Sequence, residues 1–380
     1  MNTHTTNFKS GKLIQLFFKV QGCCLPSITI NMHNSINSHM ILFDDIGSYP
    51  LPAGTSREWI ASAVKNKEPK LISILRDAMQ QKIDAGVDVP TYPQFQDMNQ
   101  QFLGIINDES TQEEPLIVRR EKARIMELGA IEEIGAEYFR KNGRKLNVRV
   151  CVTGPVELYL KQFGGTAYKD VLNAFASSID RFIGNSIDNA RQINISTVSI
   201  DEPSIGINPQ IMFNDSDLIE ALTIASKTAF ANKIDTEIHL HSPLHYKLIC
   251  RVPSIGIIGV ESAANPSYLD LIDTKDLEEY DKFLRIGAAR TDIFGMAAVL
   301  NEKYGTNVWK DTAKLEEITA QMETPETIKM RLEKAHGIFG GRIKYAGPDC
   351  GLGSWPSQEL AFKLLQNTGI GIKEFLKNRI

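Results

Sequence analysis

The chain has 380 residues, of which 42% are hydrophobic and 23% are charged, and its formal net charge is −4. This is an ordinary globular composition, and the absence of a long basic run argues against a nucleic-acid-binding protein or one bound to an anionic membrane surface. No apolar run is long enough to cross a membrane. The cysteines are odd in number and scattered, which is typical of a reduced cytoplasmic protein; they are Cys23, Cys24, Cys151, Cys250 and Cys350.

The first 39 residues differ from the rest of the chain because they carry no periodic apolar pattern. The apolar piece at 13–18 is too short for a signal peptide and contains Gln15. We therefore predict that 1–39 is a disordered tail or an over-extended start, dispensable for folding, and that 40–380 forms one domain beginning at Met40.

From Met40 onward, apolar runs with strand character alternate with segments of helical spacing. The predicted strands are 40–43, 87–92, 147–155, 197–203, 235–241, 256–261, 283–292 and 343–350. The predicted helices are 57–85, 97–106, 121–141, 170–193, 217–231, 325–339 and 358–377. This alternation indicates an α/β protein with a parallel sheet, and eight strands favour a closed (β/α)8 TIM barrel of one domain over an open, doubly wound sheet. No GxGxxG and no Walker loop points to a nucleotide.

Polar side chains collect where the predicted strands end, and in a barrel these ends form one mouth, where active sites lie. They are Ser48, Asp97, Thr153, Asp201, Glu202, His241, Glu261, Asp292, Asp349 and Cys350. Three of the seven histidines fall in 239–245, and His239 and His241 share a strand face because they are two apart. A histidine, a carboxylate and a thiol, each closing its own strand, predict a metal site with one open position.

Most of these residues also have a purely structural interpretation when taken alone. Asp201 and Glu202 could end a strand or cap the next helix, and Cys350 could be a small core residue. For His239 we favour the structural interpretation, a core histidine with satisfied hydrogen bonds. Glu261 is harder to explain in this way, because it closes a strongly apolar strand and an unpaired buried carboxylate is costly. The prediction of a site depends on their joint occurrence.

Five motifs, taken in order, resemble the catalytic half of cobalamin-independent methionine synthase, a family of the uroporphyrinogen decarboxylase-like barrels. They are Asp-Ile-Gly-Ser-Tyr-Pro at 45–50, Val-Thr-Gly-Pro-Val at 152–156, Ile-Asp-Glu-Pro at 200–203, Ile-His-Leu-His at 238–241 and Pro-Asp-Cys-Gly-Leu at 348–352. The resemblance runs from about Met40 to the C-terminus. It implies a (β/α)8 barrel that holds a zinc ion. The zinc ion would bind a substrate thiol, and the sulfur of that thiol would accept a methyl group. The expected thiol is homocysteine, which gives methionine.

The resemblance also implies roles for single residues. The family's zinc ligands correspond to His241, Glu261 and Cys350, while Pro243 stands where the family has a further cysteine. A shifted alignment would instead place His239 and His241 in the His-x-Cys positions, so that one thiolate ligand is missing either way. Ser48 and Asp201, with Glu202 beside it, match the residues that bind the amino-acid end of the acceptor. The glutamate that the family uses with them is not evident; Tyr92 or Gln94 lies in its place.

Two departures from the family concern the methyl donor. Phe294 stands where a family histidine helps to protonate the folate leaving group, and about Lys161 stands where a tryptophan packs on the folate ring. Asp292 is the nearby candidate for a catalytic acid, with His245 as another. These departures favour a methylcorrinoid, or a corrinoid protein, over methyltetrahydrofolate. The alternatives are methylation of another thiol, such as a thiol coenzyme, or a barrel that only binds an amino acid or a partner protein.

Overall fold

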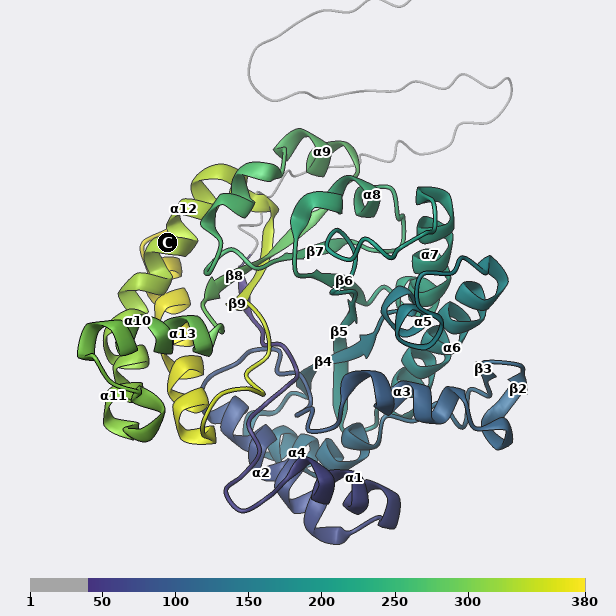
Figure 1. The fold of residues 1–380 in the computed structure, drawn as a ribbon, viewed down its shortest axis with the longest axis horizontal. Helices are drawn as coiled ribbons and strands as arrows, with labels where there is room; N and C mark the ends of the chain where they lie inside the picture. The colour runs from purple at the N-terminus through teal and green to yellow at the C-terminus, as the bar shows by residue number, and fades with distance from the viewer. Residues whose placement is uncertain (1–39, 380) are drawn as a thin grey trace, which may run out of the picture. The chain divides into compact units, whose positions relative to one another are not determined.

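The structure is a computed structural model that describes residues 40–379, so the prediction for 1–39 lies outside the described residues. Its centre is a curled parallel sheet of seven strands in the order β1-β9-β8-β7-β6-β5-β4, with helices around it (Figure 1). The strands are β1 (Leu42–Phe43), β4 (Leu146–Thr153), β5 (Ile193–Asp201), β6 (Asp235–Leu240), β7 (Ile257–Val260), β8 (Phe283–Ala289) and β9 (Ile343–Pro348). The predicted α/β class with a parallel sheet is confirmed.

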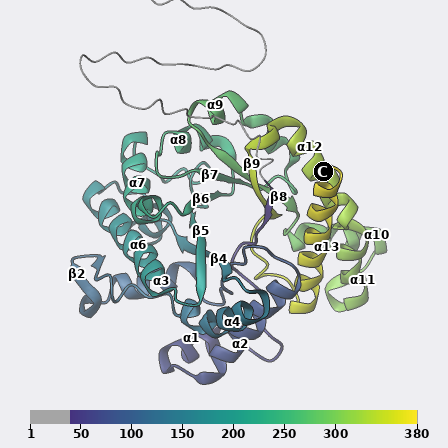
Figure 2. The ribbon, with the colours of Figure 1, turned by 180° about the vertical axis from the view of Figure 1, so that it is seen from behind.

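The helices cover the outside of the sheet, and the same ring of helices is seen from the opposite side in Figure 2. They are α1 (Arg57–Asn66), α2 (Pro69–Asp84), α3 (Met98–Ile106), α4 (Met126–Asn142), α5 (Pro155–Phe163), α6 (Lys169–Asn189), α7 (Asp215–Ala231), α8 (Tyr246–Cys250), α9 (Thr274–Glu279), α10 (Ile293–Tyr304), α11 (Thr312–Glu317), α12 (Pro325–Phe339) and α13 (Gln358–Lys377). In α6, Leu172, Phe175, Ile179 and Phe182 recur at helical spacing and are buried. No helix of the described part is long and apolar enough to cross a membrane.

The strand predicted at 87–92 makes only single parallel bridges, Val89 to Asp44 of the β1 side and Thr91 to Arg149 of β4. Pro90 has no N–H to donate to a ladder. At Thr91 the backbone N–H donates to the Asp45 carboxylate, 2.8 Å away, and the carbonyl accepts from Lys82 Nζ at 2.9 Å. Side chains thus take the backbone groups that a strand would use, and the sheet has seven strands.

Two of the predicted helices also need correction. The helix predicted at 57–85 is two helices, because Lys67 adopts a left-handed conformation (φ 54°) that ends α1, and Pro69 then opens α2. The helix predicted at 121–141 begins only at Met126, as α4. Helices α5, α8, α9, α10 and α11, and the hairpin of β2 (Gln112–Glu114) with β3 (Ile117–Val118), were not predicted.

The interior of the curled sheet carries charge. Asp44, Arg149, Glu237 and Arg285 are fully buried and come from the β1 end, β4, β6 and β8. Arg149 pairs with Asp44 at 2.6 Å and with Glu237 at 2.8 Å, and Arg285 Nε pairs with Asp44 at 2.9 Å. We call these four residues the inner charged layer. Two positive and two negative side chains make it formally neutral.

Candidate metal centre

Four side chains that could ligate a metal lie at the carboxyl edge of the sheet. His239 is next to last in β6 and His241 follows that strand, Glu261 follows β7, and Cys350 comes shortly after β9. Because β6, β7, β8 and β9 are neighbours and parallel, their carboxyl ends meet at one edge. The fold therefore brings residues more than 100 positions apart in sequence to one place.

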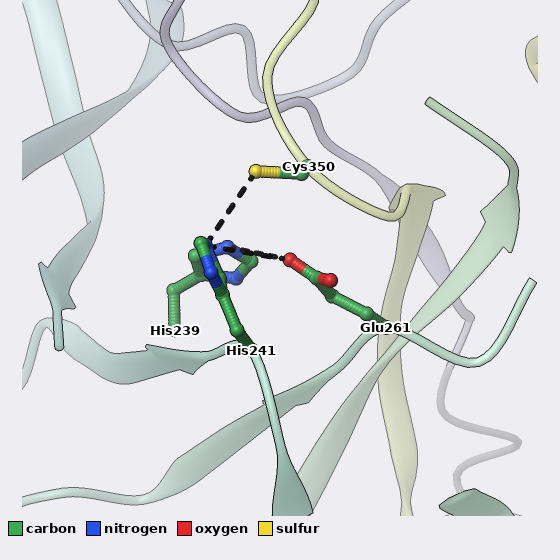
Figure 3. Close-up of side chains that lie close together, drawn as sticks. All are labelled: His239, His241, Glu261 and Cys350. Atoms are coloured by element: carbon green, nitrogen blue, oxygen red, sulfur yellow. Dashed lines mark hydrogen bonds and ion pairs between the residues drawn. The ribbon is translucent and has the colours of Figure 1, made fainter. Parts of the chain in front are cut away.

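The ligand atoms of these four residues all lie within 4.8 Å of one another, and we call the set the His-Glu-Cys group. Glu261 Oε1 lies 3.4 Å from His239 Nε2 and 3.6 Å from His241 Nε2. Cys350 Sγ lies 3.9 Å from His241 Nε2. Figure 3 shows the four side chains turned toward one another. Atoms at these separations surround a single point, as ligands of one ion do.

Several atoms of the group lack the hydrogen bonds that burial normally demands. Both ring nitrogens of His239 and Oε1 of Glu261 are buried without a hydrogen-bond partner among the described residues. Leaving such atoms unpaired costs about 1–3 kcal/mol each. A histidine with satisfied hydrogen bonds would be explained by packing alone, but this one is not. Imidazole, carboxylate and thiol together are a donor set for a transition-metal ion.

The electrostatics of the group favour a positive charge at its centre. Burial disfavours a thiolate, yet His239 and His241 outweigh it and lower the pKa of Cys350 to about 7. Burial also opposes a charged ring, but the Cys350 thiol and the Glu261 carboxylate raise the pKa of His239 well above its ordinary value. The pKa of His241 is raised in the same way, mainly by Cys350. Because metal ligands must be deprotonated, a bound cation would take the place of the protons on these rings.

Neighbouring residues hold the group in place, and one of them carries no sequence signal. Thr291 Oγ1 accepts a hydrogen bond from the backbone N–H of Cys350 at 3.2 Å, and the Trp355 indole N–H donates to the Thr291 carbonyl at 3.1 Å. Asp349 accepts from the N–H groups of Ala263 and Ala264, at 2.9 and 2.7 Å, and so ties the loop after Glu261 to the end of β9. Asp349 was among the predicted polar strand ends, whereas Thr291 was missed.

Ser48 lies beside the loop that carries Cys350. Its backbone carbonyl accepts from Leu352 N at 2.8 Å, and its hydroxyl accepts from Gly353 N at 3.3 Å. A Cβ atom on Gly351 would lie 1.8 Å from the Ser48 oxygen, so only glycine permits this approach. The structure therefore places the predicted substrate residue Ser48 next to the residue that follows Cys350.

Asp201 and Glu202 are adjacent in sequence, but their carboxylates accept hydrogen bonds from different parts of the fold. Asp201 pairs in register with His239, and its oxygens accept from the Ser199 hydroxyl at 2.8 Å and the Cys151 thiol at 3.0 Å. Glu202 instead accepts from the backbone N–H groups of Val156 and Glu157, at 2.8 and 2.9 Å, and thereby caps α5. Burial raises the pKa of Glu202 to about 8 despite these bonds. A role for Glu202 in binding substrate stays a prediction, and its carboxylate is already engaged.

Asp292 is outside the His-Glu-Cys group. Both of its oxygens pair with Arg290, Oδ1 with Nε at 3.0 Å and Oδ2 with Nη2 at 2.8 Å. Phe294, at the start of α10, is 66% exposed, and its ring lies 5.3 Å from that of Trp309. The third histidine of the 239–245 window, His245, is exposed and lines a separate cavity of about 310 Å³.

Fold and site together define an α/β protein with a curled parallel sheet and a metal-ligand group at its carboxyl edge. No model of a protein family matches the sequence, and no curated protein matches it. Among solved structures, a B12-independent methionine synthase from Shewanella sp. W3-18-1, in complex with selenomethionine, superposes with a TM-score of 0.58 at 14% identity, covering 90% of this chain and 99% of that one. A methyltransferase from Methanosarcina mazei superposes with a TM-score of 0.50 at 11% identity, covering 87% and 94%. The predicted resemblance is thus confirmed for the fold.

Proposed function

We propose that this protein is a zinc-dependent methyltransferase that transfers a methyl group to a thiol, with homocysteine as the acceptor and methionine as the product. The observation that carries the proposal is the His-Glu-Cys group, whose buried atoms lack partners and whose pKa shifts favour a cation. The fold shared with a B12-independent methionine synthase supports it. We also propose that the segment 87–92 completes a closed (β/α)8 barrel, since it bridges β4 at Arg149 and, on the other side, Asp44, the residue that follows β1.

His241, Glu261 and Cys350 are the proposed zinc ligands, and His239 is the fourth, in place of the thiolate that Pro243 cannot supply. His239 Nε2 lies close enough for this role, 3.4 Å from Glu261 Oε1. A free thiol has a pKa of about 8.5, so little of it is ionised at neutral pH, and zinc bound here would stabilise the acceptor as a thiolate. The ionised Glu261 and Cys350 balance the charge of a divalent ion.

Asp201 and Ser48 are proposed to bind the amino-acid end of the acceptor. The hydroxyl of Ser199 and the thiol of Cys151 fix the orientation of the Asp201 carboxylate. Register pairing puts Asp201 beside His239, so an ammonium group bound to Asp201 would leave its thiol near the metal ligands. A carboxylate paired with an ammonium in a partly dry site gives a strong, oriented contact.

For the methyl donor, we propose a methylcorrinoid, free or carried by a corrinoid protein, in preference to methyltetrahydrofolate. A folate nitrogen leaves poorly unless an acid protonates it. Phe294 cannot donate a proton, and Asp292, the predicted acid, has both oxygens paired with Arg290. Cobalt as the leaving atom needs no acid, so this site suits a corrinoid donor.

The test is methionine formation by the purified, zinc-loaded protein with homocysteine, offering methylcobalamin and methyltetrahydrofolate separately. We expect product from methylcobalamin only, and none after removal of the metal. Steady turnover from methyltetrahydrofolate without a corrinoid would contradict the proposed donor. Failure of every thiol tested to accept a methyl group from either donor, with metal bound, would contradict the proposed function.

A further inference from the structure

Beneath the His-Glu-Cys group, two complementary atoms of β6 are buried and unpaired. His239 Nδ1 and Glu237 Oε2 each lack a hydrogen-bond partner among the described residues, although both residues are at most 2% exposed. One is a ring nitrogen that can donate an N–H, and the other is a carboxylate oxygen that accepts. Buried polar atoms of native proteins nearly always find partners, so this pair calls for an explanation.

The two side chains lie on the same face of β6. They are two residues apart, which on a strand places them on one side with Cα atoms about 7 Å apart. In register, Gly259 of β7 is the neighbour of His239, and a Cβ atom on Gly259 would lie 3.0 Å from Glu237 Oε1. The carboxylate of Glu237 therefore extends along the strand to the level of the histidine.

Other neighbours are less suited to accept from His239 Nδ1. The other ring nitrogen, Nε2, faces Glu261. Asp201 is the register partner of His239, but its oxygens already accept from Ser199 and Cys151. Arg149 and Arg285 have only donors. Glu237 uses Oε1 for Arg149, at 2.8 Å, and keeps Oε2 unused.

We propose that Glu237 is a positioning residue for the metal centre: its carboxylate accepts the hydrogen bond from His239 Nδ1–H, directly or through one water molecule. The proton is then fixed on Nδ1, and Nε2 presents its lone pair to the metal. Carboxylates in this position orient histidine ligands and strengthen them. The proposal rests on the proposed metal site, and it links that site to the inner charged layer.

The isosteric change Glu237→Gln tests the proposal because it should switch His239 to the other tautomer. Arg149 only donates, so the amide oxygen of the substituted side chain turns toward it and leaves the NH2 group facing the histidine. His239 Nδ1 must then accept, which places the proton on Nε2, the ligand atom. We expect zinc affinity, measured by chelator competition, to fall about 10- to 100-fold. The matched control is Asp44→Asn, which removes one buried charge from the same layer without touching His239.

The tautomer of His239 gives a second readout that does not depend on metal or activity. In ¹⁵N-labelled, metal-free protein at a pH where the ring is neutral, we expect the Nδ1–H form, changing to Nε2–H in Glu237→Gln and unchanged in Asp44→Asn. Equal loss of zinc affinity in both variants, or an Nε2–H ring in the unaltered protein, would overturn the proposal. The spectrum of the unaltered protein decides the matter even if Glu237→Gln does not fold. Absence of zinc binding by the unaltered protein would instead contradict the proposed function.

Discussion

Two polar layers lie inside the curled sheet, and they differ in how closely their charges are matched. In the inner charged layer, every side chain has an opposite charge within 2.9 Å. In the His-Glu-Cys group above it, the closest separations are 3.4–3.9 Å. Both layers contain buried side-chain atoms without a hydrogen bond among the described residues: nitrogens of Arg149 and Arg285 and one oxygen of Glu237 in the inner layer, and atoms of His239 and Glu261 in the upper group. The inner layer is fully buried, whereas in the upper group only His239 is buried and the other three side chains are half-buried. The close charge pairing of the inner layer fits a structural role, and the wider spacing of the upper group fits the cation that we propose it binds.

The largest effect is expected from Cys350→Ala. Structural zinc sites are worth about 10–16 kcal/mol, so one ligand of four corresponds to about 2.5–4 kcal/mol, and zinc affinity should fall by roughly 100- to 1000-fold. Methyl transfer should drop to background while the unfolding midpoint of the metal-free protein changes little. Cys250→Ala, a buried cysteine away from the group, is the control. Full metal content and activity in Cys350→Ala would make Cys350 a core residue.

Breaking the inner charged layer should lower the stability of the metal-free protein, which Cys350→Ala should leave nearly unchanged. Arg149→Met removes the close partner of Glu237 and one of the two partners of Asp44, which keeps Arg285. The buried Glu237 carboxylate is then left without a close cation, which costs about 3 kcal/mol or more. Urea unfolding of the metal-free protein measures this. The control Arg120→Met breaks a surface pair with Asp188 and should cost about 0–1 kcal/mol. Equal effects of the two variants would show that the inner layer does not stabilise the fold.

A smaller effect is expected at the proposed acceptor site. Asp201→Asn removes the charge that we assign to the substrate ammonium, worth about 2 kcal/mol, so KM for homocysteine should rise about 30-fold. Steady-state kinetics at saturating donor measure it, and KM for the donor is the internal control. An unchanged KM for homocysteine would leave Asp201 with a structural role only.

The smallest expected effect is a difference between two cysteines in the pH dependence of their reactivity. Because the pKa of Cys350 is lowered to about 7 in the metal-free protein, its thiolate fraction should rise through pH 7, well below the ordinary pKa of a thiol. Burial raises the pKa of Cys151 well above that value, so Cys151 should stay unreactive. Iodoacetamide labelling, resolved by peptide mass spectrometry across neutral and alkaline pH, gives both profiles. A midpoint for Cys350 at its ordinary value would contradict the electrostatics described above.

Much of the fold could be predicted from the sequence because buried parallel strands leave long apolar runs between helical segments. The predicted and observed elements differ where side chains of other segments decide the local structure. At 87–92 the strand pattern is present, but Asp45 and Lys82 take the backbone groups of Thr91. The break between α1 and α2 had a signal that the prediction missed, because Pro69 lies inside the predicted helix and favours a helix start. The left-handed conformation of Lys67 could not be predicted.

Some residues of the candidate site could also be predicted from the sequence, and others could not. His241, Glu261 and Cys350 could be singled out because each ends a strand and each has a chemistry-bearing side chain. Glu237 and the rest of the inner charged layer were not predicted, because a charge inside a strand looks like one on a solvent face. The sequence favoured a core histidine with satisfied hydrogen bonds for His239, but both ring nitrogens lack a partner among the described residues, which depends on strands that meet only in the fold.

Metal analysis of the purified full-length chain tests the central claim most directly. The account predicts about one zinc per chain, bound after exhaustive dialysis, lost on chelation together with methyl transfer, and restored by one equivalent of added zinc. A protein that transfers a methyl group with no bound metal, or that takes up no zinc when one equivalent is added, would contradict it.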